Sequence, residues 1–314
     1  MLIDGITKEK NREGRIREII YGCEMKITII IRSRNNVDII DKTLKGVFEQ
    51  SFQDFEVVNF DNTSTDGTVE KIKHFNTKII SIPEGSYNPG RVLNTAIELC
   101  DSEIIVFLNS DCIPMNKHWL ENLIKPFEDP NVGAAFSRQI AGKGTLSIIQ
   151  IDTERYFGDG NIHKKLQHFF SMASSAIRKT VWVYDHFDEK MLISEDMEWS
   201  YRIKKKGYKV VYAKDSIIEH HHNYSIKQLY HRHFKEGFDS VEIFSIFGSK
   251  LSLFIEVFLL PFVYSIIRDS YDLVIHFSLT DVFIMPIYRL VLFWGRFIGT
   301  IKALNPKTKV KNRA

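Results

Sequence analysis

Ile104-Ile105-Val106-Phe107-Leu108-Asn109-Ser110-Asp111 is the most informative segment of this sequence, because an apolar run ends abruptly in polar and acidic residues. An unbroken apolar run of this length predicts a strand that is buried on both faces, as in a parallel sheet covered by helices. Val57-Val58-Asn59-Phe60-Asp61 repeats the pattern. In an open parallel sheet, ligands bind at the carboxyl ends of the strands. Asp61 and Asp111 are therefore expected at one crevice.

Strands and helices are expected to alternate through the first half of the chain. Apolar, β-rich runs predict strands at 27–31, 56–60, 78–82 and 103–108. Helical spacing of apolar residues predicts helices at about 38–50, 67–75, 90–99 and 117–127. Asp38 and Asp66 are candidate N-caps of the first two helices. This alternation predicts a doubly wound α/β fold.

The pattern is less regular in the second half. Residues 141–165 are rich in glycine and charge, which predicts loops that face the site. Residues 171–178 suit a strand or a turn. A helix is expected to follow Glu195-Asp196 and to end at Gly207. A strand at 208–212 then leads to three consecutive histidines, His220 to His222.

Composition and charge narrow the classes of partner. With 314 residues and 44% apolar and aromatic content, the chain can form a large packed core. The net charge is +3, and the tail after Thr300 carries five basic residues and no acid. A basic tail next to apolar segments favours an anionic membrane surface over nucleic acid as a partner. A soluble, unstructured terminus is the alternative.

Cysteine usage and the N-terminal residues point to the cytoplasm. Cys23, Cys100 and Cys112 are odd in number and lack metal-ligand or redox spacing, so reduced thiols are expected. Residues 1–24 are polar and charged, without an apolar run long enough for a signal peptide. They are expected to be a disordered or dispensable extension.

Two apolar segments near the C-terminus differ from the rest of the chain. Residues 251–267 and 273–294 both contain charged residues, so neither fits a spanning helix of ~20 residues with few or no charges. Arg289 and Arg296 lie seven positions apart and share a helix face. Helices lying on a bilayer and a helical subdomain packed on the core are both consistent with this pattern.

Acidic residues near strand ends are candidates for catalysis. Asp111 lies where a strand opens into a loop, a position that suits a hard divalent cation, and a turn or helix-capping acid is equally consistent. Glu195 and Asp196 are consecutive, so one can face the crevice while the other braces the loop. A carboxylate in a partly dehydrated cleft can accept a proton from a hydroxyl. Two acids that stabilise a helix N-terminus are the ordinary alternative.

Taken in order, these segments resemble the inverting glycosyltransferases of family 2, which have the GT-A fold, over about residues 25–237. The resemblance is carried by residues 29–36, 50–56, 61–68, 90–94, 107–111, 187–189, 195–196 and 207–208. Residues 111–138, 174–178 and 195–199 are most similar to the rhamnosyltransferase-like subgroup.

The resemblance implies a role for each matching residue. Asp111 matches the last acid of the Asp-X-Asp motif, which holds Mg²⁺ or Mn²⁺ against the donor diphosphate. His220 is the expected metal-binding histidine, with His222 second. Asp196 matches the general base, and Glu195 is its acidic neighbour. The residues expected to contact the nucleotide-sugar donor are Arg34, Asp61, Asn62, Arg91, Asn109 and Ser110.

Departures from the family pattern carry their own implications. Asn109 replaces the first acid of the metal motif, which implies weaker metal binding with more help from the diphosphate. Asn62 replaces an acid often used to read uracil, which leaves dTDP-rhamnose open as a donor beside UDP-sugars. The Gln-X-X-Arg-Trp motif of processive synthases is not evident after Asp196, so repeated addition to one growing polymer is not expected.

The resemblance therefore implies a metal-dependent inverting glycosyltransferase that moves one sugar to a hydroxyl of a lipid-linked glycan or polysaccharide. It implies a role in cell-envelope polysaccharide biosynthesis, peripheral to the inner face of the cell membrane. The expected organisation is an extension at 1–24, a GT-A domain at 25–237, a membrane-apposed helical region at 238–301 and a basic tail at 302–314.

Two other functions are compatible with the pattern. A sugar-phosphate nucleotidyltransferase would need a glycine-rich triphosphate loop near the N-terminus, and residues 32–35 contain no glycine. A non-catalytic membrane-associated scaffold of the same fold gains support from Asn109, whereas the intact Glu195-Asp196 pair argues against it.

Overall fold

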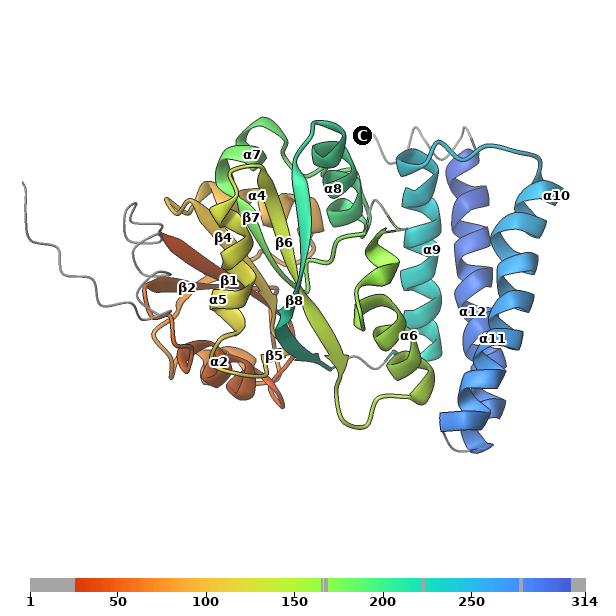
Figure 1. Cartoon of the computed structure of the whole chain (residues 1–314), viewed down its shortest axis with the longest axis horizontal. Helices are drawn as coiled ribbons and strands as arrows, with labels where there is room; N and C mark the ends of the chain where they lie inside the picture. The colour runs from red at the N-terminus through yellow and green to blue at the C-terminus, as the bar shows by residue number, and fades with distance from the viewer. Residues whose placement is uncertain (1–25, 165, 167–168, 222–223, 277–278, 306–314) are drawn as a thin grey trace, which may run out of the picture.

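The computed structural model describes residues 26–305, apart from 165, 167–168, 222–223 and 277–278. A mixed sheet of eight strands, in the order β3-β2-β1-β4-β7-β6-β8-β5, lies beside a layer of long C-terminal helices (Figure 1). The strands are β1 (Ile27–Ser33), β2 (Phe55–Asp61), β3 (Lys78–Ser81), β4 (Ile104–Asn109), β5 (Cys112–Pro114), β6 (Val132–Ala141), β7 (Ser174–Arg178) and β8 (Lys209–His220). The helices are α2 (Ile40–Phe48), α3 (Thr68–Ile72), α4 (Pro89–Glu98), α5 (Trp119–Ile124), α6 (Ser147–Phe157), α7 (Lys179–Tyr184), α8 (Glu195–Lys205), α9 (Ile226–Ile243), α10 (Lys250–Leu253), α11 (Leu260–His276) and α12 (Leu279–Leu304).

The parallel half of the sheet follows from its apolar strands. β1 pairs in parallel with both β2 and β4, and Ile29, Ile30 and Ile31 are fully buried between layers of helices. Helices cover both faces, with α2 and α5 on one side and α4, α7 and α8 on the other. The predicted α/β class and the four predicted strands are confirmed.

The ends of the parallel strands bring the predicted acidic segments together. In the sheet register Ser33 lies opposite Asp61, and Arg32 lies opposite Asn109. The carboxyl ends of β1, β2 and β4 therefore form one edge, as the sequence pattern predicted.

Some local predictions are wrong. Asp38 does not cap α2, because the N-cap position is Ile39 and it makes no side-chain cap bond. Asp66 does accept hydrogen bonds from the backbone and hydroxyl of Thr68, but α3 ends at Ile72 instead of near 75. The segment 141–165, expected to be loops, contains α6.

β8 is longer than the predicted strand at 208–212. It runs to His220, pairs in parallel with β6 and pairs antiparallel with the short β5, where Cys112 is opposite His220. His220 is therefore the last residue of a strand and not part of a following loop. This register carries the histidine to the end of the sheet where Asp111 lies.

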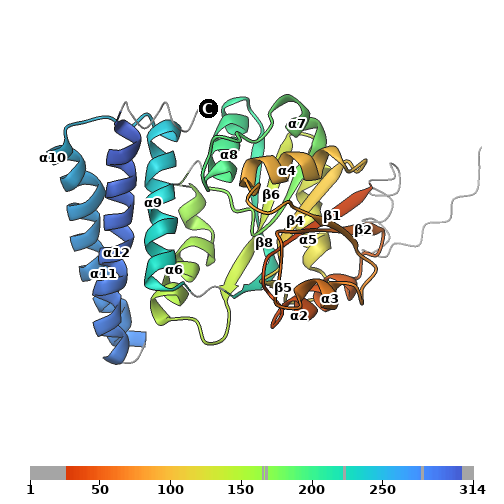
Figure 2. The ribbon, with the colours of Figure 1, turned by 180° about the vertical axis from the view of Figure 1, so that it is seen from behind.

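α12 packs against α9, and α10 and α11 lie on the other side of α12 (Figure 2). A Cβ atom added to Gly237 would overlap the backbone carbonyl of Arg296, and one added to Gly299 would overlap that of Phe234. A Cβ at Gly295 would lie 2.9 Å from the carbonyl oxygen of Tyr230. Small residues therefore allow the α9 and α12 backbones to touch, as in close helix pairs. Gly237, where the sequence suggested that the GT-A domain ends, lies inside α9.

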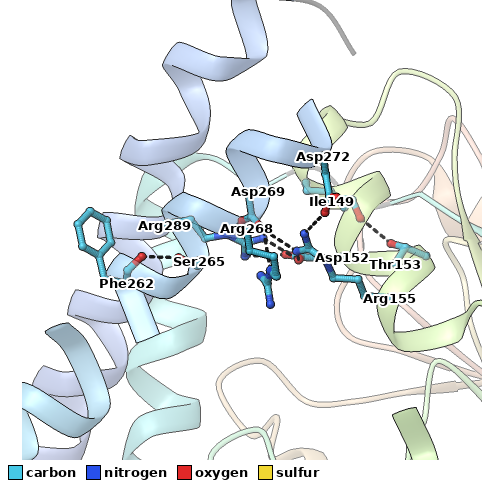
Figure 3. Close-up of polar contacts among 10 residues, drawn as sticks. All are labelled: Ile149, Asp152, Thr153, Arg155, Phe262, Ser265, Arg268, Asp269, Asp272 and Arg289. Atoms are coloured by element: carbon cyan, nitrogen blue, oxygen red, sulfur yellow. Dashed lines mark hydrogen bonds and ion pairs between the residues drawn. The ribbon is translucent and has the colours of Figure 1, made fainter. Parts of the chain in front are cut away.

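A buried ionic cluster joins these helices to α6 (Figure 3). The guanidinium of Arg289 on α12 donates to both carboxylate oxygens of Asp152 on α6, at 2.7 Å each, and to Asp269 on α11. Arg155 on α6 pairs with Asp269 at 2.7 Å and with Asp272. Because Arg289 and Asp269 are buried and pair with each other, removing either one would leave an uncompensated buried charge.

The arginines of α12 face the protein. Arg289 is only 3% exposed, and Arg296 pairs with Glu236 of α9 at 2.9 Å. The shared helix face that the sequence predicted is real, but it packs on α6 and α9 because acidic partners lie there. The opposite faces of α10 to α12 expose large apolar side chains, among them Leu251, Leu260, Tyr264, Ile267, Tyr271, Phe283 and Ile287.

Two helical segments are long and apolar enough to cross a membrane. They are Lys250–Asp272, with mean hydropathy 1.9, and Phe283–Leu304, with mean hydropathy 1.3. The sequence analysis expected neither C-terminal apolar segment to fit a membrane-spanning helix, but by length and composition both of these helical segments do. The N-terminal extension with Cys23, residue His222 and the tail beyond residue 305 lie outside the described residues.

Candidate active site

Asp111 and His220 meet at the edge of the sheet. The His220 Nε2 and Asp111 Oδ1 atoms are 3.6 Å apart, and both side chains are less than one-fifth exposed. Ligand atoms of Asp111, His220 and Cys112 all lie within 4.8 Å of one another. An aspartate oxygen and an imidazole nitrogen at this spacing can hold one divalent cation.

Gln139 of β6 orients the histidine. Its Oε1 atom lies 2.8 Å from His220 Nδ1, and its amide nitrogen donates to the hydroxyl of Ser171 at 2.8 Å. Because the glutamine oxygen can only accept, Nδ1 carries the proton and the Nε2 lone pair points towards Asp111. A hydrogen bond to the far ring nitrogen is the usual support of a metal-binding histidine.

Cys112 contributes little to such a site. Burial, and next the charge of Asp111, raise the pKa of the Cys112 thiol well above its usual range. The thiol therefore stays protonated, and only the thiolate is a strong ligand. The donor set that fits Mg²⁺ or Mn²⁺ is the carboxylate of Asp111 with the imidazole of His220, completed by ligand oxygens.

Glu195 and Asp196 begin α8, as the sequence predicted. Asp196 is half-buried and accepts hydrogen bonds from the backbone N–H groups of Met172, at 3.2 Å, and Met197, at 2.7 Å. Glu195 is only 4% exposed, and its Oε2 atom has no hydrogen-bond partner among the described residues. The two consecutive carboxyls therefore have different environments.

These environments separate the protonation states of the pair. Burial, and next the charge of Asp196, raise the pKa of Glu195 to about 8. Burial also raises the pKa of Asp196, but two backbone N–H groups and the charge of Arg32 act in the opposite direction. The two carboxyls titrate as a pair. Near neutral pH the proton resides on Glu195, and Asp196 carries the negative charge that a base needs.

Asp239 of α9 fixes the loop before α8. Its carboxylate accepts hydrogen bonds from the backbone N–H groups of Leu192, Ile193 and Ser194, at 2.9 to 3.1 Å. Asp239 is 2% exposed. The position of Glu195 and Asp196 therefore depends on a helix that follows them by more than thirty residues in the sequence.

A short chain of hydrogen bonds connects the two halves of the site. The backbone N–H of Asn109, at the end of β4, donates to the carbonyl of Ala173 at 2.9 Å. The next residue back, Met172, donates to Asp196. Asp111 follows Asn109 by two residues. The corner formed by Asp111 and His220 and the carboxyl pair therefore lie at the same end of the sheet.

Asp61 is a brace in the turn after β2. Its two carboxylate oxygens accept from the hydroxyl of Ser33, at 2.9 Å, and from the backbone and hydroxyl of Ser64, at 2.8 and 2.6 Å. Asn62 beside it is 7% exposed. Asn35 crosses to this turn, because its backbone donates to Ser64 at 2.9 Å. The loops after β1 and β2 are thus clasped into one wall.

The other predicted donor contacts occupy different positions. The Asn109 side-chain oxygen accepts from Arg32 at 2.7 Å, and the Ser110 hydroxyl donates to Asn36 at 2.6 Å. Arg34 is exposed at the rim. Arg91, at the start of α4, pairs with Glu189 at 3.0 Å on an exposed surface.

A cavity of about 290 Å³ opens beside Asp111. Asp111 is the one predicted site residue among those that line it in the described part of the chain. The other lining residues are Asn35, Asn36, Asp38, Ile39, Lys143, Thr145 and His221. The loop after β6 therefore contributes Lys143 and Thr145, which sequence reasoning missed. The flanking glycines of Gly142-Lys143-Gly144 were an available signal, because a Cβ on Gly142 would collide with the His221 ring.

Gln139 and Asp239 were also missed. Neither lies in a recognisable motif, and both act through long-range contacts that only the folded chain defines. A buried acid on α9 and a buried amide on β6 carry no local sequence signal for these roles.

Sequence comparisons place the chain among known enzymes. The family model described as Glycosyl transferase family 2 matches residues 28–187, about half of the chain. The O-antigen chain rhamnosyltransferase RfbN of Salmonella typhimurium is 27% identical over 225 residues, which cover 68% of this chain and 72% of the relative. The O-antigen chain rhamnosyltransferase WbaN of Salmonella anatum is 30% identical over 200 residues, or 60% of this chain and 64% of the relative.

Solved structures agree on the fold. The mannosyltransferase PcManGT from Pyrobaculum calidifontis was solved with GDP-Man and Mn²⁺. Its superposition on this chain has a TM-score of 0.59 and 17% identity, and it covers 88% of this chain and 86% of the mannosyltransferase. Glucosyl-3-phosphoglycerate synthase from Mycobacterium tuberculosis was solved with Mn²⁺ and UDP. Its superposition has a TM-score of 0.55 and 14% identity, and it covers 78% of this chain and 88% of the synthase. The architecture is the GT-A fold. With this fold and the family match, the chain belongs to glycosyl transferase family 2 and is a glycosyltransferase similar to the rhamnosyltransferases of O-antigen synthesis.

Proposed function

We propose that this enzyme transfers one sugar, with inversion at the anomeric carbon, from a nucleotide-diphosphate donor to a hydroxyl of a lipid-linked glycan. The observation that carries the proposal is the placement of an oriented Asp111–His220 pair and a buried Glu195–Asp196 pair at one end of the sheet. The pairs suit the two requirements of the reaction, which are neutralising the leaving group and accepting a proton.

Asp196 is the proposed base. Two backbone N–H groups hold its carboxylate in place, and its partial exposure leaves it accessible to an acceptor hydroxyl. The hydroxyl proton passes to Asp196 as the hydroxyl oxygen forms its bond to the anomeric carbon. The bond from that carbon to the diphosphate oxygen breaks, and its electron pair leaves with the nucleoside diphosphate. Glu195 stays protonated near neutral pH, which limits repulsion of that anion.

Asp111 and His220 are the proposed ligands of a divalent cation, Mg²⁺ or Mn²⁺. The bound cation would supply Lewis-acid stabilisation of the leaving diphosphate. Gln139 keeps the histidine in the tautomer that can coordinate. Since Asn109 is neutral, the protein contributes a single carboxylate at this corner. The relatives solved with Mn²⁺ and a nucleotide share the fold, which supports the choice of ion class.

The donor is proposed to be dTDP-rhamnose or a UDP-sugar. The similarity to rhamnosyltransferases supports rhamnose. The loops after β1 and β2, which contain Asn35, Asp61 and Asn62, are hydrogen-bonded to each other. In them Asn62 provides a neutral amide at the position where an acid would bind uracil. Arg34 and Arg91 are proposed to meet the donor from the rim, the latter by exchanging its exposed pairing with Glu189.

The acceptor is proposed to enter from the side of α6. A second cavity of about 940 Å³ shares Lys143 with the first one and extends to Asp272 of α11. Its lining is rich in hydrogen-bonding groups, including Gln150, Thr153, Glu154 and Asp159, which suit sugar hydroxyls. α11 also bears part of the exposed apolar face, so the lipid of an acceptor would lie next to its glycan.

The apolar face of α10 to α12 is proposed to rest on the cytoplasmic membrane surface. Large apolar side chains are exposed there, and Ile267 and Tyr271 are each 69% exposed. The ionic cluster ties the middle of α12 to α6, so the helices are held alongside the enzyme domain. Spanning the bilayer would draw that cluster into the hydrocarbon, which is costly.

A double substitution tests membrane contact. Tyr264→Glu with Ile267→Glu should release the protein from vesicles that contain anionic phospholipid, as measured by flotation. Tyr184→Glu is the matched control, because Tyr184 is also exposed, at 82%, but lies on α7. Equal flotation of both variants would refute the assignment of this face.

The base assignment has a direct test. Asp196→Asn should lower transfer by about 10²- to 10⁴-fold, the usual contribution of a general base. Nucleotide binding should be nearly unchanged, as measured by thermal shift with UDP-, dTDP- and GDP-sugars, with and without Mn²⁺. Full activity of Asp196→Asn would refute the role, and failure of every donor to bind the unsubstituted enzyme would refute the proposed reaction.

A further inference from the structure

Arg32, near the end of β1, lies between the two halves of the site. Its Cα is paired with that of Asn109 in the sheet register, and its Nη2 atom donates to the Asn109 side-chain oxygen at 2.7 Å. Burial raises the pKa values of Glu195 and Asp196, and the positive charge of Arg32 opposes that rise at both carboxyls. One guanidinium therefore reaches both the metal-binding corner and the proposed base.

The guanidinium of Arg32 is incompletely satisfied. Its Nε atom is buried and has no hydrogen-bond partner, and no carboxylate in the described part of the chain lies within 4.0 Å of its nitrogen atoms. The Nε atom of Arg138 is also buried without a partner, but a carboxylate of Glu154 lies 3.5 Å from the Arg138 guanidinium. Arg202 pairs with Asp185 and Glu198, and Arg178 donates to three backbone carbonyl oxygens.

A cation left in this state is expensive for the fold. A half-buried charge that no carboxylate touches gains little direct stabilisation, and a buried donor without an acceptor adds a desolvation cost. Such groups persist where a ligand completes them. The missing partner of Arg32 must be an anion that has several acceptor oxygens, because both Nε and the remaining guanidinium hydrogens need acceptors.

Because Asn109 is neutral, its hydrogen bond to Arg32 leaves the charge of the guanidinium uncancelled. An aspartate there would face Arg32 across the same 2.7 Å hydrogen bond and would neutralise it. Asparagine accepts the bond without cancelling the charge. Asn109 thereby orients the guanidinium and leaves its positive charge for the ligand.

Resting on the proposed function, we propose that Arg32 binds the diphosphate of the donor and supplies, together with Asp111-held metal, the positive charge that the leaving group requires. The diphosphate gains one negative charge when the bond to the anomeric carbon breaks. A guanidinium is suited to that change, because it offers parallel N–H groups to phosphate oxygens and stays charged at all working pH values. The protein would thus supply one arginine and, through Asp111 and His220, a place for one divalent cation.

Calorimetric binding of UDP, dTDP and GDP, each with and without Mn²⁺, tests the proposal on the full chain. Arg32→Gln should weaken binding of the best nucleoside diphosphate by about tenfold or more in EDTA and in Mn²⁺, and leave binding of the matching nucleoside unchanged. Arg32→Lys should lose less. Lys45→Gln, which removes an exposed positive charge on α2, is the control.

The unliganded variants provide a second readout. Because no carboxylate in the described part of the chain touches the Arg32 guanidinium and its buried Nε has no acceptor, Arg32→Gln should melt at the same or a higher temperature than the unsubstituted protein in the absence of nucleotide, with a smaller stabilisation by UDP, dTDP or GDP. A structural role would produce the reverse, a lower melting temperature without ligand.

Position 109 provides the sharpest test. Asn109→Asp restores the second acid of a metal motif, but it should weaken diphosphate binding because the new carboxylate pairs with Arg32. In the Arg32→Gln background the same substitution should no longer weaken binding. Tighter Mn²⁺-dependent binding by Asn109→Asp, or unchanged diphosphate affinity in Arg32→Gln, would overturn the proposal. If the unsubstituted enzyme binds no nucleoside diphosphate, the proposed function itself fails.

Discussion

Replacing Glu195 by glutamine should change how the stability of this enzyme depends on pH. Burial, and next the charge of Asp196, raise the pKa of Glu195 to about 8, from an ordinary value of 4.5. The folded protein therefore holds a proton that the unfolded chain releases. The stabilisation is fully present below pH 4.5 and is lost as the pH rises towards 8.

The magnitude follows from the width of that window. Each pH unit inside it removes ~1.4 kcal/mol from the free energy of unfolding. Between pH 5 and pH 8 the loss amounts to about 3 to 4 kcal/mol. Glu195→Gln keeps the shape of the side chain but cannot ionise, so this slope should disappear and the variant should be the more stable protein at pH 8.

Urea unfolding followed by tryptophan fluorescence measures the effect. Trp199 lies one turn further along α8 and is fully buried, so it reports the region directly. The difference between the two proteins isolates Glu195, since all other titrating groups are shared. If the two stability curves remain parallel from pH 5 to pH 8, Glu195 is ionised in the folded protein and the assignment of proton and charge within the pair is wrong.

Three further changes test other parts of the structure. Gln139→Leu should weaken Mn²⁺ affinity by about 10- to 100-fold, as measured by calorimetry, whereas Gln139→Glu keeps the acceptor oxygen and should retain most of it. Gly299→Ala should lower the free energy of unfolding by about 1 to 3 kcal/mol in urea titrations, because the added methyl group forces α9 and α12 apart. Arg289→Met should cost about 3 to 5 kcal/mol by the same measurement, and adding Asp152→Asn should recover part of the loss; equal stability of the single and double variants would contradict the coupling.

The parallel half of the fold could be predicted because its signals are local. Buried strands such as Ile27–Ser33 and Ile104–Asn109 are continuous apolar runs, and the polar residues that follow them mark the sheet edge. The placement of Asn109 and Asp61 at one edge followed from strand direction alone. The order of the acidic motifs along the chain was sufficient to indicate the family.

Elements that depend on tertiary contacts could not be predicted. α6 carries little amphipathic signal, because one part of it packs on β6 while Asp152 and Arg155 pair with side chains of the C-terminal helices. β8 extends to His220 because β6 and β5 pair with it, which no local pattern reveals. The arginine face of α12 was visible in the sequence, but its acidic partners lie far away along the chain.

Within the site, the sequence indicated the candidate metal ligands and the candidate base, and it missed the residues that hold them in position. Asp111, His220, Glu195 and Asp196 stand in recognisable motifs. Gln139 and Asp239 are single polar residues on a strand and a helix, and their roles follow from hydrogen bonds to distant groups. Arg32 was visible at the end of an apolar run, but the missing acceptor of its buried Nε is a property of the folded chain.

The bridge between α6 and the C-terminal helices sets a fixed geometry for everything attached to it. The paired charges between α6 and α12, together with the touching backbones of α9 and α12, leave no hinge between the apolar face and the reaction centre. The reaction centre is therefore held at a fixed distance from the surface that contacts the apolar face of α10 to α12. The span from lipid anchor to reacting hydroxyl then becomes a ruler, and acceptors whose glycan is too short or too long are rejected by reach alone.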